Sequence, residues 1–488
     1  MIKKAIVIGA GIGGLAAAIR LAAKGYQVQL FEANDRAGGK IKELLSNGFR
    51  FDMGPSVITM PHLIDELFQI HGKDREKYIP YSKLEKPFKY FFPDGSSILS
   101  YDDLDKFGDV IETNTTDSKR TLFKYLKRIK SIYDITKPVF IESSIHRLKD
   151  YFNWRFLKGI LLFHKIQAFR SMNNANHAAF NDSRLVRIMN NYATYVGSNP
   201  FVAPATLNVI QHLEITLGVY LPDRGIYSII EGLVRLAKEV GIEIKHNTLV
   251  EQIIVKDGKA SGIIAEGRQI ESDIVVSNMD IYYTYHKLLP NSKKPLRILD
   301  QDKSSSAIGF YWGIDKEFPE LNIHNMLFSN DQKAEFDSIF NKNELYTDPS
   351  IYLCITSKKI KEDAPKGKEN WFVLLTVPNT SHNNEENIVE KARELAIQKI
   401  NKMLNTKIQN HIEFEEHLSP FRIEKNYHSA FGAVYGNSSN SKWAAFMRHA
   451  NFSNKINDLY FVGGSVHPGA GIPMCLNSAK IMEQVMDD

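Results

Sequence analysis

The sequence predicts an α/β fold that begins with a parallel sheet covered by helices. Three features of the first thirty-one residues support this prediction. Residues 5–8 are a continuous apolar run, residues 9–22 combine a glycine-rich turn with a helical stretch, and residues 27–31 are a second apolar run. Short apolar runs are typical of strands buried on both faces of a sheet, and a helix between two of them forms a parallel crossover.

The turn between the first strand and the first helix has the spacing of a nucleotide-binding loop. Gly9 permits a sharp turn, Gly11 lets the backbone approach a pyrophosphate, and Gly14 lets the helix lie close to the strand. The start of the helix also offers unpaired N–H groups and a partial positive charge to phosphates. We therefore expect a bound nucleotide to contact Gly9, Gly11, Ile12, Gly13 and Gly14.

An acidic residue completes this pattern. Glu32 directly follows the second apolar run, where a carboxylate accepts hydrogen bonds from an adenosine ribose. The order of strand, glycine turn, helix, strand and acid favours a Rossmann-type dinucleotide-binding domain. The alternative is a glycine-rich loop that serves helix packing only.

Composition narrows the class of protein further. The 488 residues are 43% hydrophobic and 24% charged, which excludes a disordered chain, a collagen and a disulfide scaffold. The net charge of +5 is a mild excess that does not indicate nucleic-acid binding. Cys354 and Cys475 lie far apart without metal-ligand spacing, so we expect no metal site and a reducing, cytoplasmic location. No run reaches the roughly 20 apolar residues that a membrane-spanning helix needs.

A second glycine-rich loop follows an apolar strand near the end of the sequence. Residues 459–462 form the strand, and residues 463–475 contain four glycines and two prolines before another helix. Such a loop brings backbone N–H groups and a helix N-terminus to a cofactor, although a purely structural turn is the alternative. His467 is a candidate base or tunnel residue, but we favour a hydrogen bond to a neighbouring loop. Cys475 is expected to be a space-filling thiol.

These loops, together with residues 36–40 and 51–56, resemble the carotenoid desaturase family of FAD-linked amine oxidase relatives. Residues 192–201 and 220–236 also resemble family segments. The resemblance implies bound FAD, with a Gly-Gly pair around the pyrophosphate, backbone near Gly54 against the flavin ring and Val250 against the adenine. Lys40 stands where the family usually has arginine, so its charge remains but the bidentate fork is lost. The residues implied for the cofactor are Arg36, Gly38, Gly39, Lys40, Gly54, Pro55, Ser56, Val250, Gly464, Ser465, Gly471, Ile472, Pro473 and Met474.

The last loop narrows the implied activity. Residues 463–468 and 474–476 are similar to the hydroxycarotenoid 3,4-desaturases, although Val466 stands where the family often has threonine. The resemblance implies desaturation of a carotenoid at C-3,4 by hydride transfer to the flavin and loss of a proton. Oxygen or a quinone would then reoxidise the flavin. The alternatives are a phytoene desaturase, an amine or protoporphyrinogen oxidase, a carotene cis–trans isomerase and a carotenoid carrier without catalytic activity.

The expected domains follow from these motifs and from the strand pattern between them. A discontinuous FAD-binding domain comprises residues 1–75, 220–285 and 440–488. Strands near 305–314, 349–357 and 371–377, with a helix over 387–403, predict an α+β substrate domain over 286–439. Residues 76–219 are expected to form a helical region.

Two segments of that region mix basic and aromatic side chains. Residues 125–130 and 147–163 have the composition of helices that lie in a bilayer interface, or of a helical cap on the substrate domain. A lipid-soluble polyene substrate favours the first interpretation. We therefore expect a peripheral protein on the inner face of the cell membrane.

Overall fold

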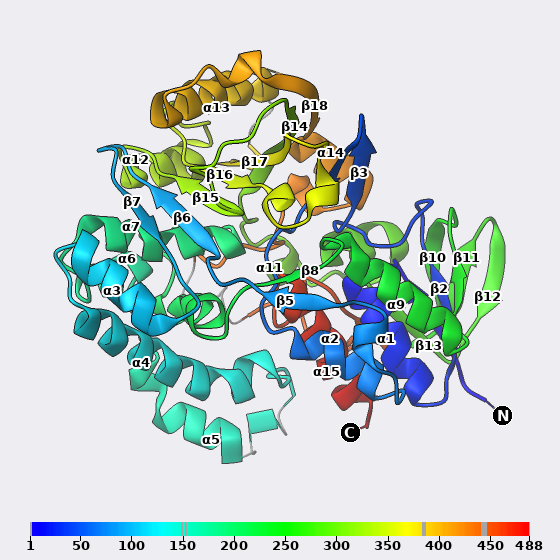
Figure 1. Cartoon of the computed structure of the whole chain (residues 1–488). Coiled ribbons are helices and arrows are strands. Elements are labelled where there is room, and N and C mark those ends of the chain that lie inside the picture. Colours follow the sequence, from blue (N-terminus) through cyan, green and yellow to red (C-terminus); the bar gives the residue numbers. More distant parts are fainter. Residues whose placement is uncertain (1, 148–149, 152–153, 383–386, 441–446, 488) are drawn as a thin grey trace.

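The structure is a computed structural model that describes residues 2–147, 150–151, 154–382, 387–440 and 447–487. Two sheets form its framework. A parallel five-stranded sheet lies beside both chain termini, and a larger mixed sheet lies next to it (Figure 1). A group of helices coloured cyan to teal lies beside the larger sheet.

The five-stranded sheet assembles segments from the beginning, middle and end of the chain. Every pair of neighbouring strands in it is parallel. The strands in spatial order are β19 (Leu459–Phe461), β13 (Ile274–Ser277), β1 (Lys4–Ile8), β2 (Gln27–Phe31) and β9 (Glu243–Lys245). Because parallel strands end at the same edge, the loops that follow β1, β13 and β19 meet there.

The apolar residues of β1 pack in alternation on the two faces of this sheet. Ala5 and Val7 belong to a core shared with the helices, whereas Ile6 and Ile8 pack against the small antiparallel sheet. The packing helices are α1 (Ile12–Ala23), α2 (His62–Gln69), α9 (Tyr227–Glu239) and α15 (Ile472–Asp487). The small sheet comprises β10 (Val250–Lys256), β11 (Lys259–Ala265) and β12 (Arg268–Glu271).

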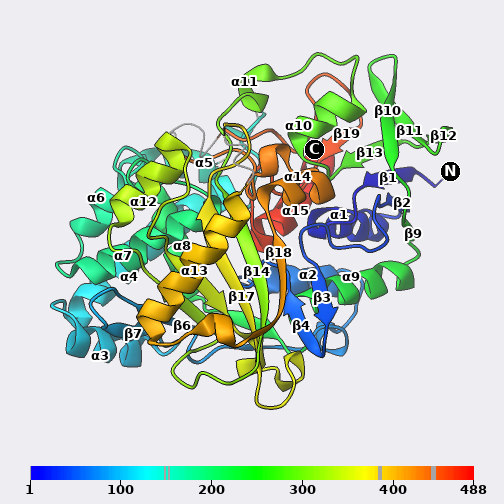
Figure 2. The same ribbon diagram turned by 90° about the horizontal axis from the view of Figure 1, so that it is seen from above.

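Helices α1 and α15 lie side by side, although 448 residues separate the end of α1 from the start of α15 (Figures 1 and 2). Arg20 of α1 strengthens this contact. Its guanidinium pairs with Glu66 of α2 and Glu483 of α15, at 2.8 Å in both cases. The N-terminal and C-terminal helices are therefore fixed to each other through their C-terminal halves, beside the parallel sheet.

The larger sheet has seven strands and separates two apolar cores. One face packs against α13 (Ile388–Leu404), and the other carries Tyr311 and Phe372 toward the hairpin of β3 (Glu43–Ser46) and β4 (Phe49–Asp52). The strands in spatial order are β18 (Ile412–Leu418), β14 (Ser306–Ile314), β17 (Glu369–Val377), β16 (Ile351–Cys354), β15 (His324–Leu327), β6 (Phe88–Phe91) and β7 (Ser97–Leu99).

The β6–β7 hairpin corrects one part of the sequence expectation. Residues 76–219 were expected to be a helical region, yet this hairpin extends the larger sheet through β15. Phe88 and Tyr90 are buried on one side of β6, whereas Lys89 and Phe91 are less buried, which is the two-residue period of a strand. The short alternating run of β6 was therefore overlooked, because most of the segment around it is helical.

Helices dominate the remainder of that region. The principal ones are α3 (Leu104–Asn114), α4 (Lys119–Thr136), α5 (Trp154–Leu161), α6 (Met172–His177) and α7 (Ser183–Asn191). The shorter elements are β5 (Tyr81–Lys83), β8 (Tyr220–Pro222), α8 (Val209–Gln211), α10 (Ile281–Tyr283), α11 (Leu296–Leu299), α12 (Gln332–Asp337) and α14 (Pro420–Tyr427). Within the described residues, every helix is too short or too polar to cross a bilayer.

Candidate functional site

Three glycine-rich segments meet at the carboxyl edge of the parallel sheet. The Gly38 N–H donates to the Ala10 carbonyl at 2.9 Å, which joins the second loop to the first. A Cβ atom added to Gly13 would lie 3.0 Å from the Cα of Gly463, so the first loop also touches the C-terminal loop. Segments from opposite ends of the chain thus form one cradle lined by backbone.

Asn278 occupies the centre of this cradle. It follows β13, its backbone N–H donates to the Ile8 carbonyl at 2.8 Å, and its side-chain amide donates to the Gly9 carbonyl at 3.2 Å. A Cβ atom at Gly11 or Gly463 would lie within 3 Å of this amide. The sequence places Asn278 at a strand end but did not identify it as a site residue. The available signal was an asparagine shortly after the apolar run 274–276, and only the structure shows that this strand pairs with β1.

Two helices start in this cradle without acidic side chains in their first turns. Gly11 is the N-cap of α1 and forms no side-chain capping bond, and α15 starts directly after Gly471. Ile472, Pro473 and Met474 make up the first turn of α15. The free N–H groups and partial positive charges of both helix starts favour an anionic group between them.

Glu32 lies against the first loop rather than projecting into solvent. Its carboxylate accepts hydrogen bonds from the N–H of Ala10 at 2.8 Å and the N–H of Asn34 at 2.9 Å, and its side chain is buried. Its carbonyl accepts a bond from Thr248, two residues before Val250. Val250 is buried in the same apolar cluster as Phe31. Residues expected at the ribose and the adenine therefore share one end of the cradle.

Arg36 and Lys40 lie in different environments. The Arg36 side chain is 61% exposed and lies 3.9 Å from Glu43, so the structure does not bring its charge into the cradle. Lys40 is partly buried, and its Nζ donates to the Val434 carbonyl at 2.7 Å. Burial lowers the pKa of Lys40, whereas the nearby Asp280 carboxylate acts in the opposite direction. Lys40 is therefore a basic residue beside the cradle, whereas Arg36 is not.

The segment from Gly54 to Ser56 links the cradle to the larger sheet. Ser56 Oγ lies 2.7 Å from the Tyr352 hydroxyl, which lies 2.8 Å from His324 Nδ1. The Tyr311 hydroxyl donates to the carbonyl that precedes Gly54, at 2.9 Å. Residues implied to approach a flavin ring therefore rest on polar groups of the larger sheet.

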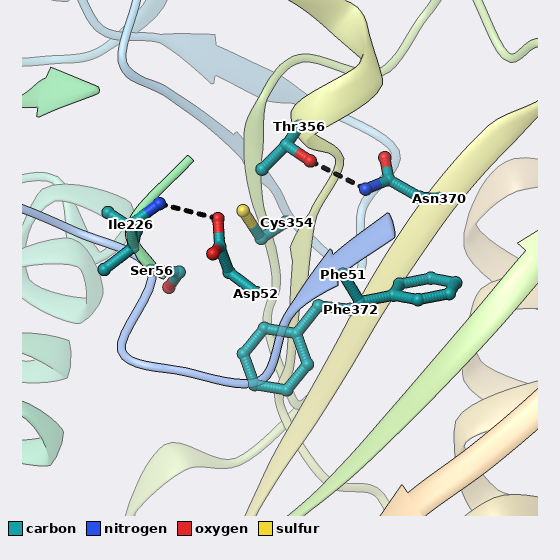
Figure 3. Close-up of a pocket in the computed structure, with 8 residues that line it drawn as sticks. All are labelled: Phe51, Asp52, Ser56, Ile226, Cys354, Thr356, Asn370 and Phe372. Carbon is teal, nitrogen blue, oxygen red and sulfur yellow. Dashed lines mark hydrogen bonds between the residues drawn. The ribbon is translucent and has the colours of Figure 1, made fainter. Parts of the chain in front are cut away.

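A small pocket beside this segment is lined by Asp52, which belongs to a buried charge network (Figure 3). Asp52 accepts hydrogen bonds from the N–H groups of Ile226 and Tyr227 at 2.9 and 3.0 Å, so it holds the start of α9. Arg50 pairs with Asp52 at 2.7 Å and with Asp363 at 3.3 Å. Burial raises the pKa of Asp363 to about 6, and Arg50 opposes this shift. The network ties β4 and α9 to the larger sheet.

The C-terminal loop is fixed by polar contacts on several sides. Ser465 Oγ accepts the Ile281 N–H at 2.9 Å, and the Arg448 guanidinium donates to the Gly464 carbonyl at 3.3 Å. His467 Nε2 lies 2.9 Å from the Ser143 carbonyl. Burial lowers the pKa of His467 to about 3, so this ring is neutral at physiological pH. Burial raises the pKa of the Cys475 thiol to about 11, which keeps it protonated.

Comparison with known proteins identifies the family. A model described as flavin containing amine oxidoreductase matches residues 12–482. The chain belongs to this family. It is a flavin-dependent oxidoreductase, and the resemblance noted in its sequence is confirmed.

Relatives within the family are similar over almost the entire chain. The chain is 46% identical to a 1-hydroxycarotenoid 3,4-desaturase of a Flavobacterium species, over 98% of both chains. It is 32% identical to a 4,4'-diapolycopene oxygenase of a Methylomonas species, over 98% of this chain and 97% of the relative. A solved oxidoreductase from Methanosarcina mazei has 17% identity and a TM-score of 0.64, and the match covers 99% of this chain and 100% of that one.

The cradle fits the flavin cofactor of such an oxidoreductase. Cβ atoms at Gly11, Gly13 and Gly463 would collide with the Asn278 side chain, so glycine at these positions lets the two loops close around Asn278 and present their backbone to a ligand. The uncapped starts of α1 and α15 and the Lys40 ammonium are suited to a pyrophosphate. These donor groups thus match the chemistry of the family's cofactor.

Proposed function

We propose that this flavin-dependent oxidoreductase desaturates a carotenoid, and that its reaction forms the C-3,4 double bond of a hydroxycarotenoid. The main support for the proposal is the 46% identity to a 1-hydroxycarotenoid 3,4-desaturase over 98% of both chains. End-to-end similarity at this level includes the cofactor loops as well as the larger sheet and the helical region. A phytoene desaturase, which acts on a different carotenoid, is the second candidate.

We propose FAD as the form of the flavin. An adenine dinucleotide requires a ribose acceptor, a pyrophosphate site and an apolar contact for the adenine. Val250, Glu32 and the start of α1 could meet these requirements, since Val250 and Glu32 share one end of the cradle and α1 starts in the loop that Glu32 contacts. Lys40 and the start of α15 would add positive charge around the pyrophosphate. The isoalloxazine end would then lie toward Gly54, Pro55 and Ser56.

The bound flavin would supply a hydride acceptor, which suits a polyene whose C–H bonds are too weakly acidic for an ordinary base. The protein's own residues would hold and enclose the substrate. Phe372 and Tyr311 stack with their rings 5.3 Å apart beneath the segment that contains Gly54. These aromatic faces would exclude water from the reacting carbons. His467, which is neutral and bonded to the Ser143 carbonyl, would position a loop rather than transfer a proton.

The decisive experiment is expression of the full chain in a carotenoid-producing host, followed by pigment analysis. Desaturation lengthens the conjugated system and lowers the product mass by two hydrogens. An isomerase would leave the mass unchanged, and an amine oxidase would release peroxide and an aldehyde from an amine. A carotenoid carrier would retain pigment without bleaching its flavin in the absence of oxygen. Unchanged pigments with every hydroxycarotenoid supplied would refute the proposal.

We also propose that the protein binds peripherally to the inner face of the cell membrane. Trp154, Leu161 and Phe169 are 70%, 69% and 67% exposed at or near α5, which lies at the edge of the molecule (Figure 1). Lys158 and Lys165 are exposed in the same segment. Exposed aromatic and basic side chains are typical of an interfacial helix. Residues 148–149 and 152–153 of the expected basic-aromatic segment lie outside the described residues.

Residues 125–130, the other basic-aromatic segment, support the alternative interpretation, which is a helical cap. Tyr125, Leu126 and Ile129 are buried within α4, so this helix packs as a cap on its neighbours. Only the stretch around α5 therefore supports the membrane proposal. A membrane location would place the enzyme beside a lipid-soluble substrate and a quinone, and we propose a quinone or oxygen as the electron acceptor.

A further inference from the structure

A buried histidine of the larger sheet has one ring nitrogen without a partner. The His324 side chain is fully buried, and its Nε2 has no hydrogen-bond partner within the described part of the chain. Burial lowers the pKa of His324 to about 3, so the ring is neutral at physiological pH. A buried polar atom without a hydrogen bond is costly, and in native proteins nearly all such atoms are paired. The unpaired nitrogen therefore indicates a polar ligand at this position.

The other ring nitrogen begins a chain of hydrogen bonds that ends at the segment implied to approach the flavin. His324 Nδ1 lies 2.8 Å from the Tyr352 hydroxyl, and that hydroxyl lies 2.7 Å from Ser56 Oγ. The His324 ring also stacks on Phe88 of β6, with 4.9 Å between the ring centroids. These contacts hold the ring in place and leave Nε2 for a ligand. A single hydroxyl thus separates His324 from Ser56.

The strand register places His324 in a row of side chains that crosses one face of the larger sheet. His324 lies opposite Cys354 in the β15–β16 pair, and Cys354 lies opposite Phe372 in the β16–β17 pair. Directly opposed residues of antiparallel strands project to the same face. Cys354, Phe372 and Ser56 line the same pocket (Figure 3). His324 is therefore the next side chain in the row beyond one wall of this pocket.

We propose that His324 Nε2 binds the hydroxyl group of the hydroxycarotenoid substrate, and that Tyr352 and Ser56 hold His324 in position for this contact. This role rests on the proposed function and names the group by which the substrate is recognised. In a 1-hydroxycarotenoid a single carbon separates C-1, which carries the hydroxyl, from C-3. The hydroxyl therefore enters the site together with the C-3,4 bond, beside the segment that contains Gly54 and Ser56.

A hydroxyl group fits this nitrogen in either tautomer of the neutral ring. If the Tyr352 hydroxyl donates to Nδ1, then Nε2 carries the hydrogen and donates to the substrate oxygen. If Nδ1 donates to Tyr352, then Nε2 accepts the hydrogen of the substrate hydroxyl. A hydroxyl can do both, whereas a carbonyl fits only the first arrangement. Burial raises the pKa of Tyr352 and of Cys354, so both neighbours are uncharged, which suits an uncharged substrate.

The test compares a 1-hydroxycarotenoid with the same carotenoid lacking the hydroxyl, using the flavin-loaded protein. The wild type should convert the hydroxylated compound with a kcat/KM about 10- to 100-fold higher, because the analogue leaves Nε2 unpaired. His324→Phe keeps an aromatic ring against Phe88 but removes both nitrogens, so it should convert the two compounds at similar rates. Tyr352→Phe should lose part of the preference, because it frees Nδ1. Tyr125→Phe, which removes a buried hydroxyl bonded to Asn176 instead, should keep the wild-type preference.

A binding measurement without turnover separates recognition from chemistry. A flavin reduced in advance under anaerobic conditions cannot accept a hydride, so the dissociation constants of both compounds can be titrated. The wild type should bind the hydroxylated compound about 10-fold more tightly, and His324→Phe should bind both equally. Equal binding of both by the wild type, as expected if only water pairs with Nε2, would overturn the assignment and leave the desaturase proposal intact. An unchanged preference in His324→Phe would do the same. Hydroxyl-dependent binding without any loss of hydrogen would retain the hydroxyl site and refute the desaturase proposal.

Discussion

The side-chain amide of Asn278 donates a hydrogen bond to the Gly9 carbonyl at 3.2 Å and lies beneath both the first glycine loop and Gly463. This one side chain therefore supports loops from both ends of the chain. Its polar atoms occupy space that the glycines leave open. The cofactor cradle depends on a residue from the middle of the sequence as much as on the two terminal motifs.

Asn278→Leu should weaken flavin retention without unfolding the protein. Leucine has a similar size but cannot donate to the Gly9 carbonyl, and an unpaired buried carbonyl costs about 1–3 kcal/mol. We expect flavin affinity to fall about tenfold, measured from the flavin absorbance that remains after dialysis. Asn410→Leu, at an exposed position away from the cradle, is the matched control. Equal flavin content in both variants would show that Asn278 does not support the site.

Gly14→Ala should disturb the contact between α1 and the end of β1. The added Cβ atom would lie 2.0 Å from the Gly9 carbonyl oxygen, so the backbone of the first loop must move. Overpacking of this kind costs about 1–3 kcal/mol, and we expect loss of bound flavin as well as a lower melting temperature. Gly72→Ala is the control, because its Cβ would meet no atom within 4 Å at a φ of +64°. That variant should lose some stability through backbone strain and keep its flavin.

Arg50→Met should destabilise the junction between the parallel sheet and the larger sheet. Asp52 and Asp363 are 5% and 1% exposed, and the substitution removes the cation that pairs with both. Breaking a buried ion pair costs about 3–5 kcal/mol, which urea denaturation would measure as a lower free energy of unfolding. Arg224→Met removes a pair with Glu231 at a side chain that is 73% exposed. Its effect should stay within about 0.5 kcal/mol.

Glu214 should make the stability of the folded protein fall as pH rises. Its pKa is about 7 in the folded chain against 4.5 as the ordinary value, so folding favours the protonated form. This contribution is complete below about pH 4.5 and is lost as the pH rises through about 7, with an upper limit of about 3 kcal/mol. Melting temperatures of the wild type and Glu214→Gln should therefore diverge between those two pH values. Parallel curves would contradict the raised pKa.

The double variant Trp154→Ser with Phe169→Ser should bind vesicles less than the wild type. Both side chains are more than 65% exposed, so their removal takes away apolar area that could enter a bilayer. Flotation with anionic vesicles would measure the fraction bound, which we expect to fall at least severalfold. Phe421→Ser, at a 42% exposed aromatic in α14, should leave flotation unchanged. A wild type that remains in the soluble fraction at every salt concentration would refute membrane binding.

Local sequence patterns sufficed for much of the fold. The apolar runs at 5–8 and 27–31 form β1 and β2, and the helix expected over 387–403 is α13 at Ile388–Leu404. These predictions hold because strand and helix periodicities are properties of adjacent residues. The hairpin of β6 and β7 was missed because its strands are four and three residues long and gain their partner, β15, from more than 200 positions away.

The sequence by itself determined the parallel sheet, the glycine loops and the family, because these depend on short motifs whose spacing is fixed by backbone geometry. Only the tertiary structure decided that Asn278 lies within the cradle, that Arg36 points away from it and that Glu214 is buried between two tyrosines. Each of these facts depends on contacts between segments far apart in the chain. Burial and charge environment arise only when those segments pack, so no local pattern encodes them.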